Sequence, residues 1–182
     1  AQMKTDDVLK ALLRESSQTF VPSGRFAYHY ARGKLASDPI FRALLQRGVF
    51  GPGGRCLDLG CGQGSLFAWL LAARSLYERG QWPHGWPAAP AWSRLHGIEL
   101  MPRDVKRAGR AFGVDHPLVR IEQGDMNLAP FGQADVITIL DALHYFDYAG
   151  QTAVLQRIYA ALPPGGLFLT RVGDAGAGLP FY

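Results

Sequence analysis

The sequence has very little cysteine: Cys56 and Cys61 are the two cysteines among its 182 residues. They lie at opposite ends of one predicted strand, which would hold them roughly 16 Å apart, far beyond the reach of a disulfide. Without a disulfide framework, a reducing cytoplasmic location is expected. The five histidines are scattered without the spacing of metal ligands, so we predict no metal site.

Long apolar runs are lacking too, and so is a strong charge of either sign. No run is long enough to span a bilayer, so we expect no transmembrane helix, and no apolar stretch near the first residues predicts a secretory signal. The formal net charge is +4, which permits an anionic partner without demanding one. The composition therefore favours an ordinary globular domain that acts without a membrane partner.

Glycine, by contrast, is abundant at 22 residues, and the pattern of apolar residues changes near residue 50. The predicted helices cover residues 6–17, 24–34 and 39–46 in the first part, then a helix capped by Ser65, 102–112 and 149–162, with Ser37 or Asp38 capping the third. The predicted strands are 55–59, 96–100, 118–121, 134–140 and 167–172. This alternation predicts a mostly parallel sheet with right-handed crossovers: residues 1–50 form a helical lid or cap, and residues 51–182 form the core.

Residues 81–95 interrupt this alternation. They contain three prolines and three of the four tryptophans: Pro83, Pro87, Pro90, Trp82, Trp86 and Trp92. The segment is too rich in proline for a helix and is interpreted as an insertion between the helix that begins at Ser65 and the second strand. It is either a surface loop packed by its own aromatic side chains or a substrate-facing or dimer-forming loop.

Polar residues stand at the ends of the predicted strands, where parallel sheets bind ligands. They are Asp58 with Gly60, then Glu99, Asp125 and Asp141. In the loop after the first strand, Asp58 is followed by glycines with the spacing G-x-G-x-G, whereas the dinucleotide-binding fingerprint has the spacing G-x-G-x-x-G. A pyrophosphate is disfavoured beside a carboxylate, but a cationic amino-acid ligand is favoured there. The spacing therefore argues against an NAD-dependent oxidoreductase.

The run C-L-D-L-G-C-G-Q-G, residues 56–64, resembles motif I of class I S-adenosylmethionine-dependent methyltransferases. The resemblance extends from about Arg55 to Gly173. It implies a three-layer α-β-α Rossmann-like fold with a mostly parallel sheet of five visible strands behind N-terminal helices. It also implies S-adenosyl-L-methionine as the cofactor.

The resemblance also implies roles for individual residues. The cofactor would lie against Asp58 and the loop residues Gly60, Cys61, Gly62 and Gly64. Glu99 would hold the ribose hydroxyls, Leu100 would pack beside the adenine, Asp125 and the Met126 backbone would lie near the adenine amino group, and Asp141 would lie near the methionine moiety. An alternative remains open for each acid: Asp58 as a hydrogen-bonding residue at the entry to the helix, Glu99 as a plain strand-end acid, Asp125 as an aspartate turn and Asp141 as a helix cap.

Residues outside these motifs give further candidates. Tyr28 or Tyr30 would lie across the sulfonium with its π face, or would only pack the helix against the sheet. Arg32 and Lys34 would meet the cofactor carboxylate or an acidic substrate. His144 would serve as a general base near neutral pH, or as a structural hydrogen-bonding residue.

A basic stripe lies on the predicted helix 102–112, formed by Arg103, Lys106, Arg107 and Arg110. It would contact nucleic acid or would simply be a solvated helix face. Leu140-Asp141-Ala142-Leu143 stands where amine methyltransferases of nucleic-acid bases carry an Asn/Asp-Pro-Pro-aromatic tetrad, which weakens that function.

The leading hypothesis is methyl transfer to a small-molecule acceptor, at a hydroxyl oxygen of an apolar or aromatic compound. The alternatives are an RNA or protein methyltransferase and a non-catalytic subunit that binds the cofactor. The family's sheet usually has seven strands, closed by a hairpin after the fifth. Because this sequence ends about ten residues after the fifth predicted strand, we expect that it is truncated or that a partner covers the edge.

Overall fold

The computed structural model describes residues 4–171. The last residue of the predicted fifth strand and everything after it lie outside the described residues, and so does any closing hairpin. Within residues 4–171, no helix combines the length and the apolar character that crossing a bilayer requires.

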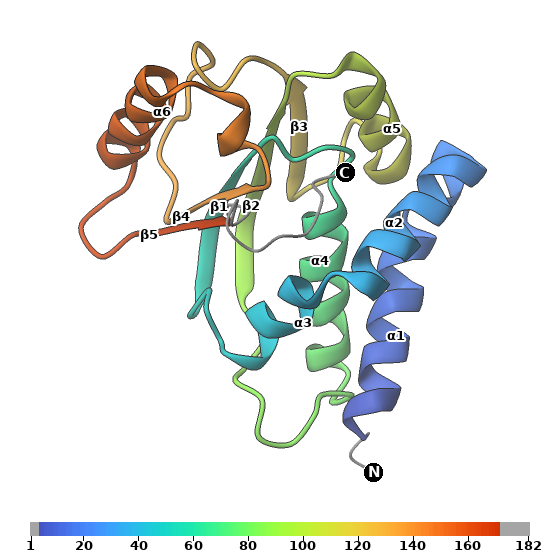
Figure 1. Cartoon of the computed structure of the whole chain (residues 1–182). Helices are drawn as coiled ribbons and strands as arrows, with labels where there is room; N and C mark the ends of the chain where they lie inside the picture. The colour runs from blue at the N-terminus through green and yellow to red at the C-terminus, as the bar shows by residue number, and fades with distance from the viewer. Residues whose placement is uncertain (1–3, 172–182) are drawn as a thin grey trace, which may run out of the picture.

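Five parallel strands form one sheet in the order β3-β2-β1-β4-β5 (Figure 1). The strands are β1 (Gly53–Leu59), β2 (Ala91–Glu99), β3 (Val119–Gln123), β4 (Val136–Leu140) and β5 (Leu167–Arg171). The order reverses between β1 and β4, and such a switch point opens a crevice at the carboxyl ends of the strands. The predicted α/β fold with a parallel sheet is confirmed.

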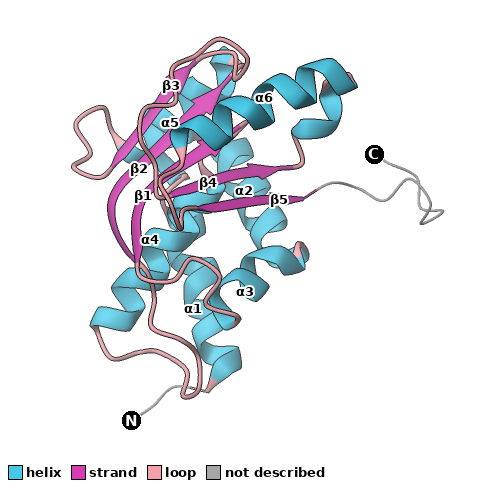
Figure 2. Ribbon diagram, turned by 90° about the vertical axis from the view of Figure 1, so that its left-hand side faces the viewer, coloured by secondary structure: helices cyan, strands magenta, loops and turns pink. Residues whose placement is uncertain are grey.

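Helices cover both faces of this sheet (Figure 2). They are α1 (Thr5–Gln18), η1 (Val21–Ser23), α2 (Arg25–Ser37), α3 (Pro39–Gln46), α4 (Ser65–Glu78), α5 (Pro102–Phe112), η2 (Leu143–Tyr145) and α6 (Tyr148–Ala161). The larger core packs α1, α3 and α4 against one face, and a second core packs α6 against the other. The N-terminal helices thus form an extra layer outside α4 (Figure 1).

The period-two alternation of the strands sorts side chains between these two cores. Leu57 and Leu59 point toward α6, whereas Cys56 packs in the core that contains α4. Asp58 follows the same alternation as Cys56 and is buried, so the strand pattern itself brings a carboxylate into the interior.

The insertion is shorter than predicted, because β2 already begins at Ala91. Residues 91–95, including Trp92, are strand. The remaining loop is packed by its own aromatic side chains: Trp82 makes edge-to-face contacts with Trp86 and Tyr77, and its indole N–H donates to the Pro87 carbonyl. The loop lies where β2 begins, at the opposite end of the sheet from the crevice (Figure 1). A substrate-facing role is therefore wrong, and a dimer-forming role stays a prediction.

One of the two predicted helix caps is found in the structure, and the other is not. Asp38, not Ser37, caps α3 by accepting a hydrogen bond from the Ile40 N–H at 3.1 Å. Ser65 does not cap α4: the cap position is Gly64, which forms no side-chain cap bond. The glycine loop therefore runs directly into α4 and leaves the first N–H groups of the helix without a capping side chain.

Candidate cofactor site

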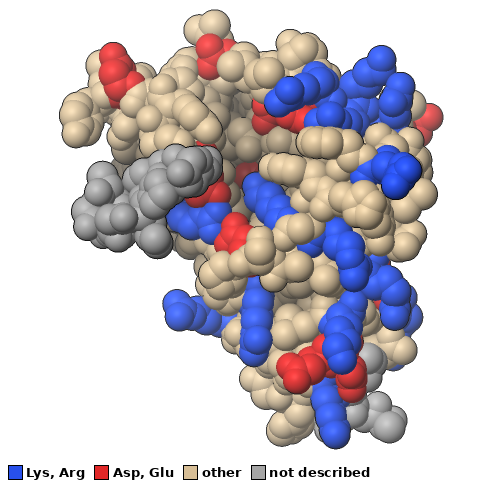
Figure 3. Space-filling model, turned by 45° about the vertical axis from the view of Figure 1, so that its right-hand side comes forward, with Lys and Arg blue, Asp and Glu red and all other residues tan. Residues whose placement is uncertain are grey.

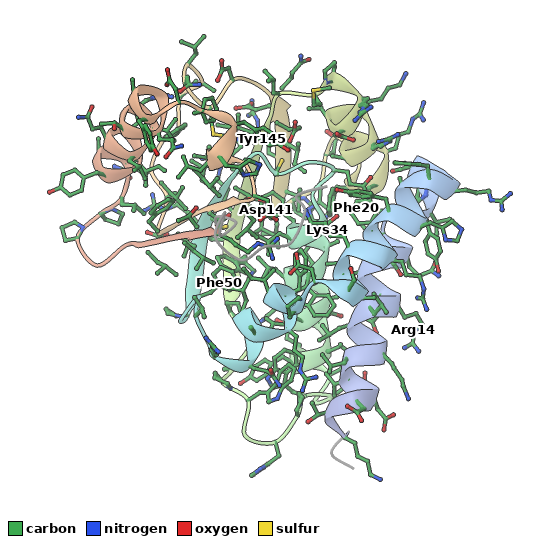
Figure 4. The ribbon with its side chains drawn as sticks, in the orientation of Figure 1. Arg14, Phe20, Lys34, Phe50, Asp141 and Tyr145 are labelled. Carbon is green, nitrogen blue, oxygen red and sulfur yellow. The ribbon has the colours of Figure 1, made fainter. Side chains whose placement is uncertain are left out.

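A cavity of about 730 Å³ opens at the carboxyl ends of the strands. This volume lies within the range of about 300–1,000 Å³ that is typical of small-molecule sites. Figure 4 shows Asp141, Lys34 and Tyr145 gathered at this end of the sheet. The cavity is lined by Tyr30, Lys34, Gly60, Gly62, Ile98, Glu99, Leu100, Met101, Arg103, Gly124, Asp125, Met126, Leu140, Asp141, Ala142, Tyr145 and Phe146.

The glycine loop forms the floor of the cavity. The N–H groups of Gly60 and Cys61 donate to the Ile98 carbonyl at 2.8 and 3.4 Å, which folds the loop over β2. Gly60 has a φ of 74°, and a Cβ atom there would come within 2.8 Å of the Ala142 side chain. Gly62 has a φ of 56° and open space where its Cβ atom would be. Gly60 therefore has no room for a side chain, whereas Gly62 adopts a conformation that favours glycine and leaves room for a ligand against the backbone.

Glu99 ends β2 and is only 8% exposed. Its Oε2 atom accepts a hydrogen bond from the Gly62 N–H at 2.7 Å, and its Oε1 atom accepts one from the Met101 N–H at 2.8 Å. Each carboxylate oxygen can accept a second hydrogen bond. The carboxylate is thus held rigidly at the cavity wall and retains the capacity to accept two ligand hydroxyls.

Asp58 lies just behind the wall, 4% exposed. Its Oδ1 atom accepts a hydrogen bond from the Thr138 hydroxyl at 2.6 Å. Burial raises the pKa of this carboxyl to about 7, and the nearby Glu99 carboxylate raises it as well, against the lowering effects of Thr138 and the Lys34 ammonium. A buried acid that is half ionised near neutral pH responds strongly to a cation placed close to it.

The loop after β3 supplies another side of the cavity. Asp125 forms an aspartate turn, because its Oδ1 atom accepts from the N–H and the side-chain amide of Asn127 at 2.8 and 3.1 Å. Asp125 also lines the cavity beside Met126 and Leu100. Arg157 of α6 holds this loop by donating to the Met126 carbonyl. The turn and the cavity contact thus coexist at Asp125.

Asp141 follows β4 in a left-handed conformation, with a φ of 63°. Such a conformation is uncommon for a residue other than glycine, although aspartate tolerates it better than most. The Arg171 guanidinium donates to both Asp141 oxygens, with Nε to Oδ1 at 2.7 Å, and also to Asp38 Oδ1 at 2.6 Å. Burial would raise the pKa of Asp38, but this hydrogen bond helps to hold it below the usual range. Asp141 does not cap a helix; it is fixed by Arg171.

Six of the predicted site residues do not line the cavity, and one of them is Arg32 of α2. Asp58 is buried behind the cavity wall, and Gly64 lies at the start of α4. The Cys61 side chain is buried toward Gly97, where an added Cβ atom would come within 2.5 Å of its sulfur. Tyr28 lines a different hollow on α2, because residues two apart on a helix point about 200° apart.

His144 is the last of these residues. It is exposed and contacts Tyr145, with the ring centroids 4.2 Å apart. Tyr145 and Phe146, which the sequence analysis did not single out, line the cavity in its place. No periodic signal marks them, since η2 is a single short turn after β4.

The cavity gathers three carboxylates, Glu99, Asp125 and Asp141, around a glycine-rich floor. Carboxylates accept hydrogen bonds from hydroxyl and amino groups and favour positive charge. Among the described residues, no group of three or more His, Cys, Asp and Glu side chains is arranged to hold a metal ion. Fold and site together define a Rossmann-like domain whose cavity is suited to a ligand with hydroxyl, amino and cationic groups.

Comparison with known proteins narrows this class. Residues 27–177 match a family model described as a methyltransferase domain, so the chain belongs to this family. A carboxy-S-adenosyl-L-methionine synthase of Chromohalobacter salexigens is 30% identical over 119 residues, which are 64% of this chain and 39% of that protein. The chain thus spans about two fifths of the length of this curated relative.

Solved structures share the fold. A complex of DhpI with SAH superposes with a TM-score of 0.56 at 18% identity, covering 88% of this chain and 69% of that one. The glycopeptide N-methyltransferase MtfA, complexed with S-adenosyl-L-methionine, superposes with a TM-score of 0.54 at 20% identity, covering 78% and 57%. S-adenosyl-L-methionine is the cofactor of the family, and the open backbone at Gly62 and the three carboxylates fit it.

Replacing Arg171 by Gln tests whether this arginine holds the cavity wall. Asp38 and Asp141 would lose their shared partner, and we expect the free energy of unfolding to fall by about 1–3 kcal/mol. The control is Arg120→Gln on β3, whose guanidinium pairs with Glu122 at a 72% exposed position and should cost under about 1 kcal/mol. Urea denaturation measures both, and equal losses would contradict the assigned role.

The raised pKa of Asp58 predicts proton release when the cofactor binds. The cationic ammonium group of S-adenosylhomocysteine favours the ionised carboxylate, so at pH 7 on the order of half a proton should leave each site. Calorimetric titration in two buffers of different ionisation enthalpy detects this proton. Asp58→Asn, which keeps an acceptor for Thr138, should abolish the Asp58 contribution. A wild-type binding enthalpy that is identical in both buffers would refute the prediction.

Proposed function

We propose that the protein transfers a methyl group from S-adenosyl-L-methionine to a hydroxyl oxygen of a small apolar or aromatic acceptor. The observation that carries the proposal is the buried Glu99 carboxylate, anchored by two backbone N–H groups at the wall of the cavity. It is shaped to accept the two ribose hydroxyls. The other carboxylates would face the adenine amino group at Asp125 and the cationic methionine end at Asp141.

Lys34 supports the orientation of the cofactor. It lines the cavity from α2, one helical turn after Tyr30, and forms no salt bridge among residues 4–171. An ammonium group beside three carboxylates would meet the carboxylate of the methionine moiety. Tyr30 would then present its ring to the sulfonium, as a π face attracts a cation.

The aromatic side of the cavity supports an apolar acceptor. Tyr145, Phe146 and Tyr30 line it, and Tyr145 and Tyr30 are 80% and 48% exposed. Aromatic rings that stand exposed at a cavity offer contact area to a planar or apolar compound. The acceptor would therefore lie between α2 and the turn after β4.

S-adenosyl-L-methionine supplies an electrophilic methyl group on its sulfonium. The residues of this chain hold the two reactants in line and exclude water, which accounts for most of the acceleration in such a displacement. As the methyl carbon bonds to the acceptor oxygen, its bond to sulfur breaks and the sulfur keeps the electron pair. The hydroxyl proton must pass to a base.

We propose His144 as that base. The Arg171 guanidinium donates hydrogen bonds to both oxygens of the Asp141 carboxylate, so that carboxylate is already engaged. His144 does not itself line the cavity, but its ring lies against Tyr145, which does, with the ring centroids 4.2 Å apart, and a neutral imidazole nitrogen can accept a proton. The turn η2, which carries His144, thus offers a proton acceptor close to the part of the cavity that is proposed to hold the methyl acceptor.

The cofactor assignment predicts selective binding of S-adenosylhomocysteine over NAD. Glu99→Ala should weaken that binding by about 10²-fold or more, since two hydrogen bonds to a charged group would be lost and each is worth about 1.5–3 kcal/mol. Calorimetric titration measures both proteins, and a thermal melt shows that the variant is folded. A folded wild-type protein that binds neither ligand, or a variant with unchanged affinity, would overturn the assignment.

The base assignment predicts that His144→Gln slows methyl transfer by about 10²-fold or more while the affinity for S-adenosylhomocysteine stays unchanged. The assay incubates the protein with labelled cofactor and a panel of phenols and matched anilines, and quantifies methyl ether and methylamine products. Phenols should be methylated in preference. Turnover of the variant within two-fold of wild type would exclude His144 as the base.

A further inference from the structure

A second hollow, of about 390 Å³, lies between the start of α2 and α5, beside the cofactor cavity. It is lined by Ser23, Gly24, Arg25, Phe26, Arg103, Lys106, Arg107 and Arg110. Five of these eight side chains are cationic, and among the described residues the lining contains no acid. Arg103 lines both this hollow and the cofactor cavity, so the two are adjacent.

The fold gathers these cations from two elements. Arg103, Arg107 and Arg110 recur at the three- and four-residue spacing that shares one face of a helix, while Ala108 of α5 is buried. The Ser23 hydroxyl donates to the Arg107 carbonyl at 2.7 Å, and Phe20 packs edge-to-face on Phe112. These contacts fasten η1 to α5 and bring Arg25 into the hollow. Figure 3 shows the basic side chains clustered over α5.

Part of this charge is neutralised inside the protein, and part is not. Arg107 pairs with Asp104 at 2.8 Å and stacks over the Phe26 ring at 4.4 Å, so it forms a fixed wall. Arg103 lies 3.8 Å from the same Asp104 carboxylate. Within residues 4–171, no salt bridge involves Arg25, Lys106 or Arg110. Like charges four residues apart, such as Lys106 and Arg110, repel each other on a helix, and a bound anion would relieve this repulsion.

The start of α2 adds to the same potential. Gly24 occupies the cap position of this 13-residue helix and provides no side-chain cap, and Gly24, Arg25 and Phe26 all line the hollow. The first N–H groups of a helix carry partial positive charge. They reinforce the field of the arginine and lysine side chains in the hollow.

We propose that this hollow is a binding site for a phosphate group. A phosphate offers several acceptor oxygens and up to two negative charges, which match forked guanidinium donors from Arg103 and Arg110 and the point charge of Lys106. The group belongs either to a small phosphorylated molecule or to the backbone of a nucleic acid. A phosphate group in this hollow would lie beside the cofactor cavity, because Arg103 lines both.

Titration with sodium pyrophosphate at constant ionic strength tests the site. The double variant Lys106→Gln/Arg110→Gln should weaken pyrophosphate binding at least ten-fold. The control Arg42→Gln/Arg47→Gln removes the same charge from exposed residues that line neither hollow and should leave binding within two-fold. Both variants should bind S-adenosylhomocysteine as the wild type does, which shows that they are folded. Absence of saturable pyrophosphate binding, or equal weakening in both variants, would overturn the proposal.

A second arm identifies the source of the phosphate. A single-stranded 20-nucleotide uridylate that binds far more tightly than pyrophosphate, with a salt dependence that the Lys106→Gln/Arg110→Gln variant reduces, would assign the site to a nucleic-acid backbone. Binding no tighter than that of pyrophosphate would assign it to a small phosphorylated molecule. Uridylate and pyrophosphate binding that both survive the double variant would exclude the hollow as the site.

Discussion

The bond between the Glu99 carboxylate and the Gly62 N–H is the contact on which the rest of the site depends. It joins the loop after β1 to the end of β2, and the second oxygen joins that strand to the start of α5 through Met101. A charged acceptor strengthens both hydrogen bonds, particularly at a position that is 8% exposed. The Glu99 carboxylate therefore holds together the glycine loop at the floor of the cavity, the end of β2 in its wall and the start of α5.

The other acids of the site depend on different kinds of support. Asp58 is buried with one hydroxyl partner, so its charge is costly until a cation arrives. Asp141 is exposed enough to reach a ligand but is fixed by Arg171, which reaches on to Asp38 at the start of α3. Arg171 therefore links the helical segment before residue 50 electrostatically to the sheet. A movement of α3 would change the position of Arg171 and hence its contact with Asp141.

The fold and the motif residues could be predicted from the sequence because their causes are local. Strand and helix periodicities, the glycine loop and the acids at strand ends all lie within short windows, and Gly60, Glu99, Asp125 and Asp141 indeed line one cavity. The sequence-based predictions were wrong where contacts between residues distant in the sequence determine the local structure. Trp92 lies in β2, where it pairs with Gly54 of β1 and packs on Phe50, and helix geometry leaves Tyr30, but not Tyr28, facing the cavity. The bridge from Arg171 to Asp38 spans 133 residues and left no pattern in the sequence.

The distribution of charge across the two hollows follows from the same geometry. Three carboxylates line the cavity at the strand ends together with Lys34 and Arg103, whereas all the charged residues that line the second hollow are cations. A cationic cofactor and an anionic group would each be drawn to one side and disfavoured on the other, since fields of opposite sign discriminate between ligands. Asp104 separates the two regions by pairing with Arg107 and lying close to Arg103. Its carboxylate thus neutralises part of the positive charge of α5 next to Arg103, the residue that the two hollows share.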